Sequence, residues 1–534
     1  MNHGEAKRRQ AEEVTNILTL ITVLITGQLT GNKGIAYVAV AVEVYALVWT
    51  AVSGNLSDTL GRLLRGRKNR GQYGNIGRLR KNAMFFQVAL GLAGSLILLF
   101  FAETIAEGIF GIRYSTFIIR VLSPIILLRT VSAVLLGYFQ GDGLELPRAI
   151  SGILRQIFIL GFGLLFSGMM KNYGEKVSNL LMQENFTFMH SGAGIAIAVC
   201  LAEIFIIIFL MVIFRGSQRA ERRNRKEERF ATETFPDSVR YLYVSRWPLL
   251  VTGVLKTVPF AAGLIFFVRE AEDENAAALE YGLYAGKYLA ICGIIVCLIS
   301  AVSLPVTARI FTCLRSGENR FAKKVFQSGV HICLIHGIFS SVFLAFMGEQ
   351  IAGLLCPENE ETLQKMFAGG STLVLFTALA CYFGRFLQIT GKKYLVLGAV
   401  GMADIVFFFF AIILLQVSKA GILALVYGGM AGMAVLCVVL GLFAYRQLRT
   451  QADWLGILLV PLGAGGVAGL VTMLLGRTLS PYLGSLVTLL AGFAVSTVIY
   501  WILLLVLRNF KEHELEAIPG GRLIEKIGQL FHIF

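Results

Sequence analysis

Long apolar runs dominate this chain and decide what it can fold into. The runs measure roughly 18 to 28 residues and are separated by short polar stretches, and a helix needs about 20 such residues to cross a hydrocarbon core of about 30 Å. Only 15% of the 534 residues are charged, against roughly 25% in an average soluble domain. Because lipid offers no partners for backbone polar groups, we predict an all-α polytopic membrane protein.

The apolar runs predict fourteen transmembrane helices. We place these spans approximately at residues 14–31, 35–57, 82–102, 115–139, 147–169, 191–214, 241–268, 279–304, 325–348, 366–390, 394–416, 420–445, 454–475 and 482–507.

Lys and Arg are distributed unequally among the polar segments. If the N-terminus and every second loop are cytoplasmic, these segments hold 33 Lys and Arg residues and the opposite loops hold 8. This asymmetry predicts that the N- and C-termini are both cytoplasmic. The basic clusters at 62–81 and 215–229 are expected to lie beside anionic membrane lipids. No soluble domain remains for a polyanion, so the net charge of +15 does not indicate a nucleic-acid partner.

The two halves of the chain are similar at an offset of about 248 residues. Residues 138–143 read YFQGDG and residues 386–391 read FLQITG. Two six-helix halves in the same orientation predict a pseudo-two-fold axis along the membrane normal, with a binding site between them near the midplane. The predicted organisation is an N-terminal six-helix lobe (1–214), a basic cytoplasmic linker (215–240), a C-terminal six-helix lobe (241–445), two further helices (446–507) and a cytoplasmic tail (508–534).

Seven basic residues fall inside the predicted spans. A charge at a helix centre costs about 2.5–3.5 kcal/mol on insertion scales, so such residues face a cavity or a partner instead of lipid. Three of them lie near span ends, where snorkelling to the interface is an equal alternative; these are Arg120, Arg246 and Arg385. The other four lie deeper, and we predict that they line a cationic substrate-binding cavity; they are Arg129, Arg155, Lys256 and Lys287.

Three acidic residues, Glu43, Glu203 and Asp404, also lie near the middle of spans. Each either forms an ion pair with a neighbouring basic residue, which we favour, or binds Na⁺ or H⁺ as a coupling ion. The sequence contains no metal-ligand spacing, nucleotide-binding motif or nucleophile elbow. We therefore expect no enzyme, no catalytic residue, no metal site and no cofactor apart from a coupling ion.

Several short motifs carry a family resemblance. Residues 136–141 read LGYFQG and residues 147–151 read PRAIS, while shorter matches occur at 281–282 (YG), 303–305 (SLP) and 518–523 (IPGGRL). Together they resemble the SpoVB-like polysaccharide-export branch of the MOP flippase superfamily, which is related to the lipid II flippase MurJ. The resemblance implies two six-helix lobes forming a V, a cationic central cavity and transport by alternating access.

The function implied by this resemblance is export of an isoprenoid-pyrophosphate-linked saccharide, either lipid II or a polysaccharide repeat unit, from the inner to the outer leaflet of a bacterial inner membrane. Its partners would be that anionic lipid-linked saccharide and membrane lipids. One alternative is a major-facilitator or multidrug-type secondary transporter, because residues 54–62 (GNLSDTLGR) resemble the loop in which Asp58 and Arg62 would form a cytoplasmic gate. A membrane enzyme of lipid-linked sugars is less favoured, since the longest outer loop, about 170–190, is short.

Overall fold

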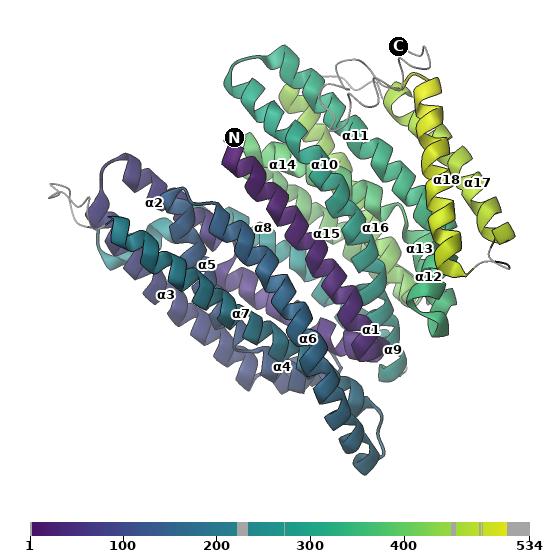
Figure 1. Cartoon of the computed structure of the whole chain (residues 1–534), viewed down its shortest axis with the longest axis horizontal. Coiled ribbons are helices and arrows are strands. Elements are labelled where there is room, and N and C mark those ends of the chain that lie inside the picture. The colour runs from purple at the N-terminus through teal and green to yellow at the C-terminus, as the bar shows by residue number, and fades with distance from the viewer. Residues whose placement is uncertain are drawn as a thin grey trace. The chain divides into compact units, whose positions relative to one another are not determined.

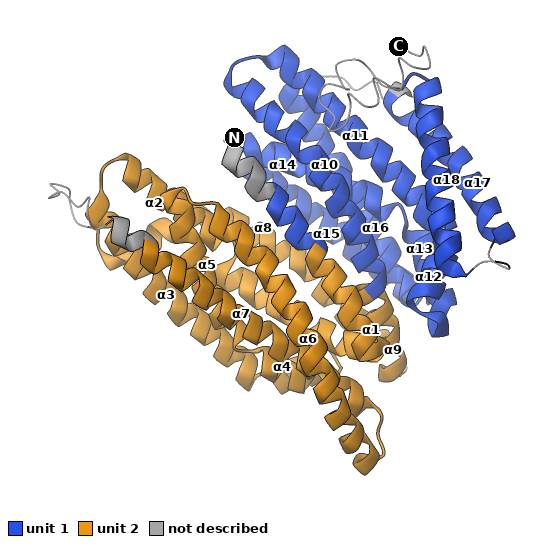
Figure 2. Ribbon diagram, viewed as in Figure 1, with its two compact units in different colours: residues 1–17, 287–534 blue, residues 18–286 orange. Residues whose placement is uncertain are grey.

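The computed structural model describes residues 3–221, 233–271, 273–449, 455–479, 482 and 484–509, and every regular element among them is a helix (Figure 1). This confirms the predicted all-α class. The chain divides into two compact units: unit 1 comprises Met1–Ile17 and Lys287–Phe534, and unit 2 comprises Leu18–Gly286 (Figure 2). Part of the predicted linker, most of the predicted tail and the motif at 518–523 lie outside the described residues.

Unit 2 contains most of α1 and all of the helices from α2 to α9. Their bounds are α1 (His3–Ser53), α2 (Leu56–Asn69), α3 (Tyr73–Phe100), α4 (Ser115–Leu122), α5 (Ile125–Asp142), α6 (Leu146–Leu181), α7 (Asn185–Glu221), α8 (Phe235–Glu270) and α9 (Glu274–Leu283), with a π-helical turn at Thr104–Ile109.

Twelve helices in the described part of the chain are long and apolar enough to cross a membrane. The number becomes thirteen if the bent pair Pro357–Gly370 and Leu373–Ile389 counts as one span. The predicted number was fourteen. The difference arises partly because the first two predicted spans fall within a single segment, Gln10–Asn69, of 60 residues. As one straight helix this segment would measure about 90 Å, three times the hydrocarbon core.

Helix α1 contains one non-helical residue, Gly31, with φ 73° and ψ 169°. Glycine adopts a positive φ at little cost, whereas a side chain would be strained there. The side chain of Ile35 packs against Gly27, although eight residues of straight helix would separate them by about 12 Å. The chain therefore bends sharply at Gly31, between the two spans predicted from the sequence.

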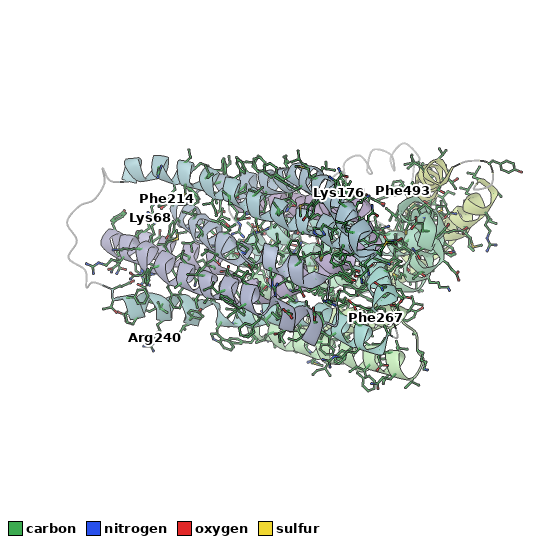
Figure 3. All side chains as sticks on the ribbon, turned by 90° about the horizontal axis from the view of Figure 1, so that it is seen from below. Lys68, Lys176, Phe214, Arg240, Phe267 and Phe493 are labelled. Carbon is green, nitrogen blue, oxygen red and sulfur yellow. The ribbon has the colours of Figure 1, made fainter. Side chains whose placement is uncertain are left out.

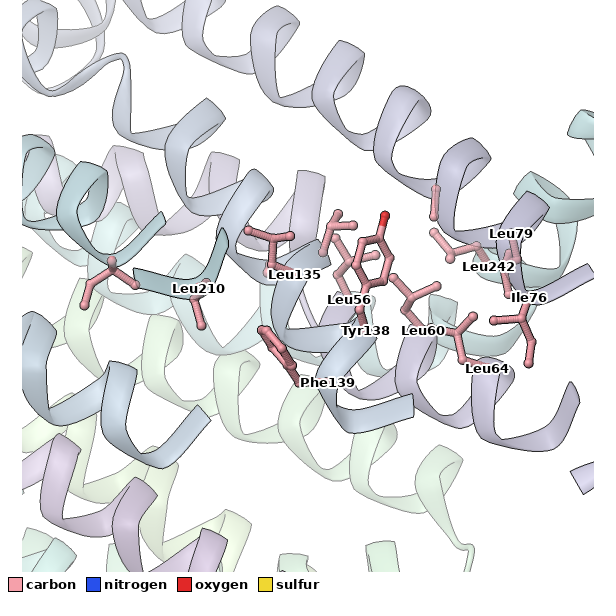
Figure 4. Close-up of a cluster of buried hydrophobic side chains, with 14 residues drawn as sticks. Leu56, Leu60, Leu64, Ile76, Leu79, Leu135, Tyr138, Phe139, Leu210 and Leu242 are labelled. Atoms are coloured by element: carbon pink, nitrogen blue, oxygen red, sulfur yellow. The ribbon is translucent and has the colours of Figure 1, made fainter. Parts of the chain in front are cut away.

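Glycines bring α2 and α5 close together in unit 2. Gly137 and Gly141 are one helical turn apart and face Leu60 and Leu64, and Gly61 faces Gln140. Small residues let helix backbones approach closely within a membrane. The two glycines of the LGYFQG motif thus serve helix packing. The contact is part of a buried apolar cluster drawn from α2, α3, α5, α7 and α8 (Figure 4).

Predicted cytoplasmic and outer residues lie toward opposite ends of unit 2. Lys68 and Arg240, both in predicted cytoplasmic segments, lie at the same end of the helices (Figure 3). Lys176, in a predicted outer loop, lies toward the other end (Figure 3). That loop is short because α6 continues to Leu181 and α7 begins at Asn185, so the region is mostly helical.

Unit 1 contains the first turns of α1 and the helices that follow α9. Their bounds are α10 (Leu289–Arg315), α11 (Asn319–Phe346), α12 (Gly348–Leu355), α13 (Glu360–Gly370), α14 (Leu373–Ile389), α15 (Lys393–Gln416), α16 (Leu423–Leu448), α17 (Val460–Leu479) and α18 (Ser485–Val506), with a 3₁₀ turn at Pro357–Asn359 and a π-helical turn at Leu455–Leu459. A further π-helical turn, Tyr284–Tyr288, leads from α9 into α10.

The two C-terminal helices pack against α11. Tyr500 of α18 is 1% exposed and donates a hydrogen bond from its hydroxyl to the Ile335 carbonyl at 2.9 Å. Ala464 and Ala468 of α17 are buried in the same apolar cluster. Small side chains on α17 and a satisfied tyrosine hydroxyl on α18 therefore join these helices to unit 1.

Candidate functional site

The candidate site is centred on Glu203, a fully buried carboxylate on α7 of unit 2 with 0% of its side chain exposed. Arg155 of α6 donates through Nε to Oε2 at 2.7 Å and through Nη2 to Oε1 at 3.1 Å. Arg129 of α5 places its Nε 2.9 Å from Oε2, and Ser132 Oγ donates to Oε1 at 2.5 Å. Both carboxylate oxygens are thus occupied, which is the condition for retaining a charge in a membrane interior.

Three packed helices hold this cluster. Helices α6 and α7 form an antiparallel pair in which Gly194 lies against the backbone of Phe166 and Ser167. Ser167 and Ser191 hydrogen-bond across the same pair at 2.8 Å. Arg129 and Ser132 are three residues apart on α5, and this spacing turns both side chains toward Glu203.

The two arginines are not equivalent. Arg155 makes a bidentate contact and is 11% exposed, whereas Arg129 is 23% exposed. Arg129 Nε is close to the carboxylate but not aligned for a hydrogen bond with any group among the described residues. With two guanidiniums and one carboxylate the cluster keeps one surplus positive charge, and Arg129 is the member better placed to offer it to an anion.

The other two basic residues predicted for the cavity form no hydrogen bond or ion pair with Glu203 among the described residues. Lys256 is exposed near the middle of α8 and makes no ion pair or hydrogen bond within the described ranges. Lys287 belongs to unit 1, is 4% exposed and donates to the carbonyl of Leu355 at 2.8 Å. Leu355 ends α12, so the ammonium group lies at a helix C-terminus, where a cation is favourable.

The three acidic residues within the predicted spans also differ in whether they have a basic partner. Glu203 has two basic partners, Arg129 and Arg155. Glu43 of α1 and Asp404 of α15 have no basic partner in the described part of the chain. One oxygen of Asp404, Oδ2, is buried without a hydrogen-bond partner among those residues.

The structure adds an ion pair that the sequence did not predict. Arg385 of α14 pairs with Glu13 of α1 within unit 1, and its Nη1 donates to the Ser300 carbonyl at 3.4 Å. Glu13 is 8% exposed. It had been assigned to the cytoplasmic N-terminal segment, one residue before the first predicted span. The signal available in the sequence was Arg385, a basic residue within a span that needs a carboxylate partner.

A second unpredicted contact involves the family motifs. Arg148, in the PRAIS stretch, donates through Nη1 to Asp58 at 2.6 Å and to Gln140 of the LGYFQG motif at 3.3 Å. Arg62 instead donates to the backbone carbonyl of Asp58 and to Thr59. The carboxylate expected to form a gate with Arg62 is therefore paired with Arg148.

Comparison with known proteins supports one family. The family described as polysaccharide biosynthesis protein matches residues 11–311. Stage V sporulation protein B of Bacillus subtilis (strain 168) is 21% identical over 538 residues, covering 96% of each chain. Among solved structures, the lipid II flippase MurJ in an inward closed conformation aligns with a TM-score of 0.64 at 13% identity, covering 93% of this chain and 97% of that one.

A second similar fold is an inward-facing multidrug resistance MATE transporter of the MOP superfamily. It aligns with a TM-score of 0.61 at 13% identity, over 82% of this chain and 96% of that one. At this identity the structural likeness concerns the fold alone, while the family match covers more than half of the chain. The resemblance inferred from the motifs is confirmed: the chain belongs to the polysaccharide biosynthesis protein family, is similar to stage V sporulation protein B, and has a fold like those of the lipid II flippase MurJ and a transporter of the MOP superfamily.

Proposed function

We propose that this protein flips an isoprenoid-pyrophosphate-linked saccharide from the inner to the outer leaflet of a bacterial inner membrane by alternating access. The observation that carries the proposal is the Glu203 cluster, in which two arginines share one carboxylate and leave a surplus positive charge. A pyrophosphate offers several oxygens that a guanidinium binds through charge-assisted hydrogen bonds. The MurJ-like fold supports the same substrate class.

The four predicted cavity residues have different expected roles under this proposal. Arg129 and Lys256 contact the pyrophosphate, since they are the more exposed of the four. Arg155 positions Glu203 and contributes charge, because its guanidinium is held in a bidentate contact. Lys287 donates a hydrogen bond to the C-terminal carbonyl of α12. Its expected role is therefore to stabilise this helix end as well as to bind substrate.

The test measures binding and export of a lipid-linked saccharide by Ala variants at the four positions, normalised to the folded protein in the membrane. Lys256→Ala should keep the folded amount and lower binding about ten- to a hundredfold, the value of one charge-assisted hydrogen bond of about 1.5–3 kcal/mol. Arg129→Lys should recover only part of the loss of Arg129→Ala, because lysine lacks the planar fork. Full activity in Arg129→Ala and Lys256→Ala would end the proposal.

We further propose the finer topology predicted from the sequence. Counting the two segments of α1 separately, and the bent pair as one span, gives fourteen spans. On this basis two six-helix lobes precede two additional helices, and both termini are cytoplasmic. The predicted lobe boundaries at residues 214 and 241 remain predictions.

Coupling to Na⁺ or H⁺ is part of the proposal. Glu203 is occupied by two arginines, so Glu43 and Asp404 are the better candidates for the coupling site. Asn or Gln in their place removes the ionisable group with little change in volume. At least one of the variants Asp404→Asn and Glu43→Gln should abolish the dependence of transport on the ion gradient. The amount of folded protein in the membrane should not change in that variant. Unchanged gradient dependence in both variants would exclude these acids.

The second candidate is a multidrug-type transporter of a small solute, favoured by the fold likeness to a MATE transporter. It is distinguished by what co-purifies with the protein. A lipid-linked saccharide identified by mass spectrometry supports the flippase, whereas saturable binding of drug-like cations without such a lipid supports the second candidate.

A further inference from the structure

A buried arginine in unit 2 has no carboxylate partner among the residues that the structure describes. Arg246 of α8 is 0% exposed. Its Nη2 donates to the Val52 carbonyl at 3.2 Å, and its guanidinium lies 4.5 Å from the centre of the Tyr243 ring, whose phenol also interacts with it. Nε and Nη1 are buried without a hydrogen-bond partner among the described residues, and no carboxylate acts on the group within that part of the chain.

This arrangement differs from that of two other arginines within the predicted spans. Arg155 and Arg385 each have a carboxylate partner. A buried cation needs a compensating charge and acceptors for its N–H groups. A backbone carbonyl and a tyrosine ring supply partial negative charge only, so the environment of Arg246 is electrostatically incomplete.

A second buried polar side chain, on α3, is also without a hydrogen-bond partner among the described residues. Gln87 of α3 is 0% exposed, and neither its Nε2 nor its Oε1 has a hydrogen-bond partner in the described residues. Phe86, its chain neighbour, contacts the Tyr243 ring with a centroid distance of 5.8 Å. Tyr243 precedes Arg246 by three residues, about one helical turn. The contact thus places Gln87 and Arg246 within about one helical turn of each other along α3 and α8.

We propose that Arg246 is the centre of a binding site for a small inorganic anion, with chloride as the expected occupant and Gln87 as a further donor. A monatomic anion accepts several hydrogen bonds at once and neutralises the guanidinium, which a water molecule cannot do. A site with no solvent-exposed surface at its arginine favours an ion of this size over a phosphate group or a lipid headgroup. The inference does not depend on the transported substrate.

The experiment measures thermal unfolding of the purified full chain in detergent while chloride replaces gluconate at constant ionic strength. A ligand that binds only the folded state raises the midpoint temperature in a saturable manner, here by about 2–4 °C. Arg246→Gln should abolish the dependence on chloride. Gln87→Leu should raise the half-saturating chloride concentration roughly twofold to tenfold, the effect of losing one hydrogen bond.

Arg385→Gln is the matched control, because that arginine has its own carboxylate, and it should keep the full response to chloride. If Arg246→Gln does not fold, Arg246→Lys retains the charge without the planar donors and should require about tenfold more chloride. Equal midpoints in chloride and gluconate for the unmodified protein would show that only water fills the site and would overturn the proposal. A chloride response retained in Arg246→Gln, or unchanged in Arg246→Lys, would overturn it as well.

Discussion

Replacing Glu203 with Gln tests whether its carboxylate holds the α5, α6 and α7 cluster together. The change keeps the side-chain volume and removes the charge that faces Arg129 and Arg155 at 2.9 and 2.7 Å. Because Glu203 is completely buried, water cannot replace it, and the two guanidiniums then repel each other. Removing one partner of a buried ion pair costs about 3–5 kcal/mol, which corresponds to roughly a 10²- to 10⁴-fold loss in the folding equilibrium.

The assay is unfolding of the purified variant in detergent, followed by tryptophan fluorescence. Glu103→Gln is the control, since its pair with Arg120 spans 3.1 Å but leaves the side chains 66% and 47% exposed. That exposed pair should cost only about 0–1 kcal/mol. Adding Arg155→Met to Glu203→Gln should recover part of the stability, because one uncompensated charge is then removed. The reasoning fails if Glu203→Gln is no more destabilising than the control, or if the double variant is less stable than Glu203→Gln.

Three further predictions concern packing, the candidate gate at residues 54–62 and topology. Gly141→Ala should destabilise unit 2 by about 1–3 kcal/mol, since its Cβ would lie 2.6 Å from a side-chain carbon of α2. Gly161 has open space around it, so Gly161→Ala should be neutral in the same unfolding assay. Asp58→Asn should alter stability by about 0.2–1 kcal/mol and reduce transport mildly, as its ion pair is partly exposed; severe loss of transport at normal abundance would favour the major-facilitator hypothesis. The side chain of Glu361 is 80% exposed, so a cysteine in its place should react with an impermeant thiol reagent added outside intact cells. A cysteine placed in 219–229 should not react. The reverse pattern would contradict the predicted orientation.

The sequence predicted the fold class because apolar length is a local property that each run carries by itself. It also identified Arg129, Arg155 and Glu203 as residues that lipid does not tolerate. The pairing among them depends on how α5, α6 and α7 rotate about their axes. Spacing along one helix does not determine that rotation, so the sequence left open whether the arginines meet Glu203 or an external anion.

The partners of Lys287 and Arg385 have no signal in the local sequence. The acceptor for Lys287 is a backbone carbonyl, a group that every residue possesses. The separation of Glu13 and Arg385 is 372 residues, so nothing near either residue identifies its partner. The boundary predicted between spans 1 and 2, at residues 32–34, adjoins the bend at Gly31, but the structure has a single helix, α1, on both sides of it.

The origin of unit 1 from two separate parts of the chain has a consequence for synthesis. Unit 2 is continuous from Leu18 to Gly286, whereas Met1–Ile17 belongs with the chain after Lys287. A ribosome adding about 5–20 residues per second needs roughly 20 to 75 seconds to progress from Glu13 to Arg385, 372 residues later. During this interval residues 1–17 are already synthesised but Arg385 is not, so the carboxylate of Glu13 remains in water or among lipid headgroups. We therefore expect the N-terminal turns to be the last part of α1 to become protected from protease on stalled nascent chains, only after Arg385 has left the ribosome.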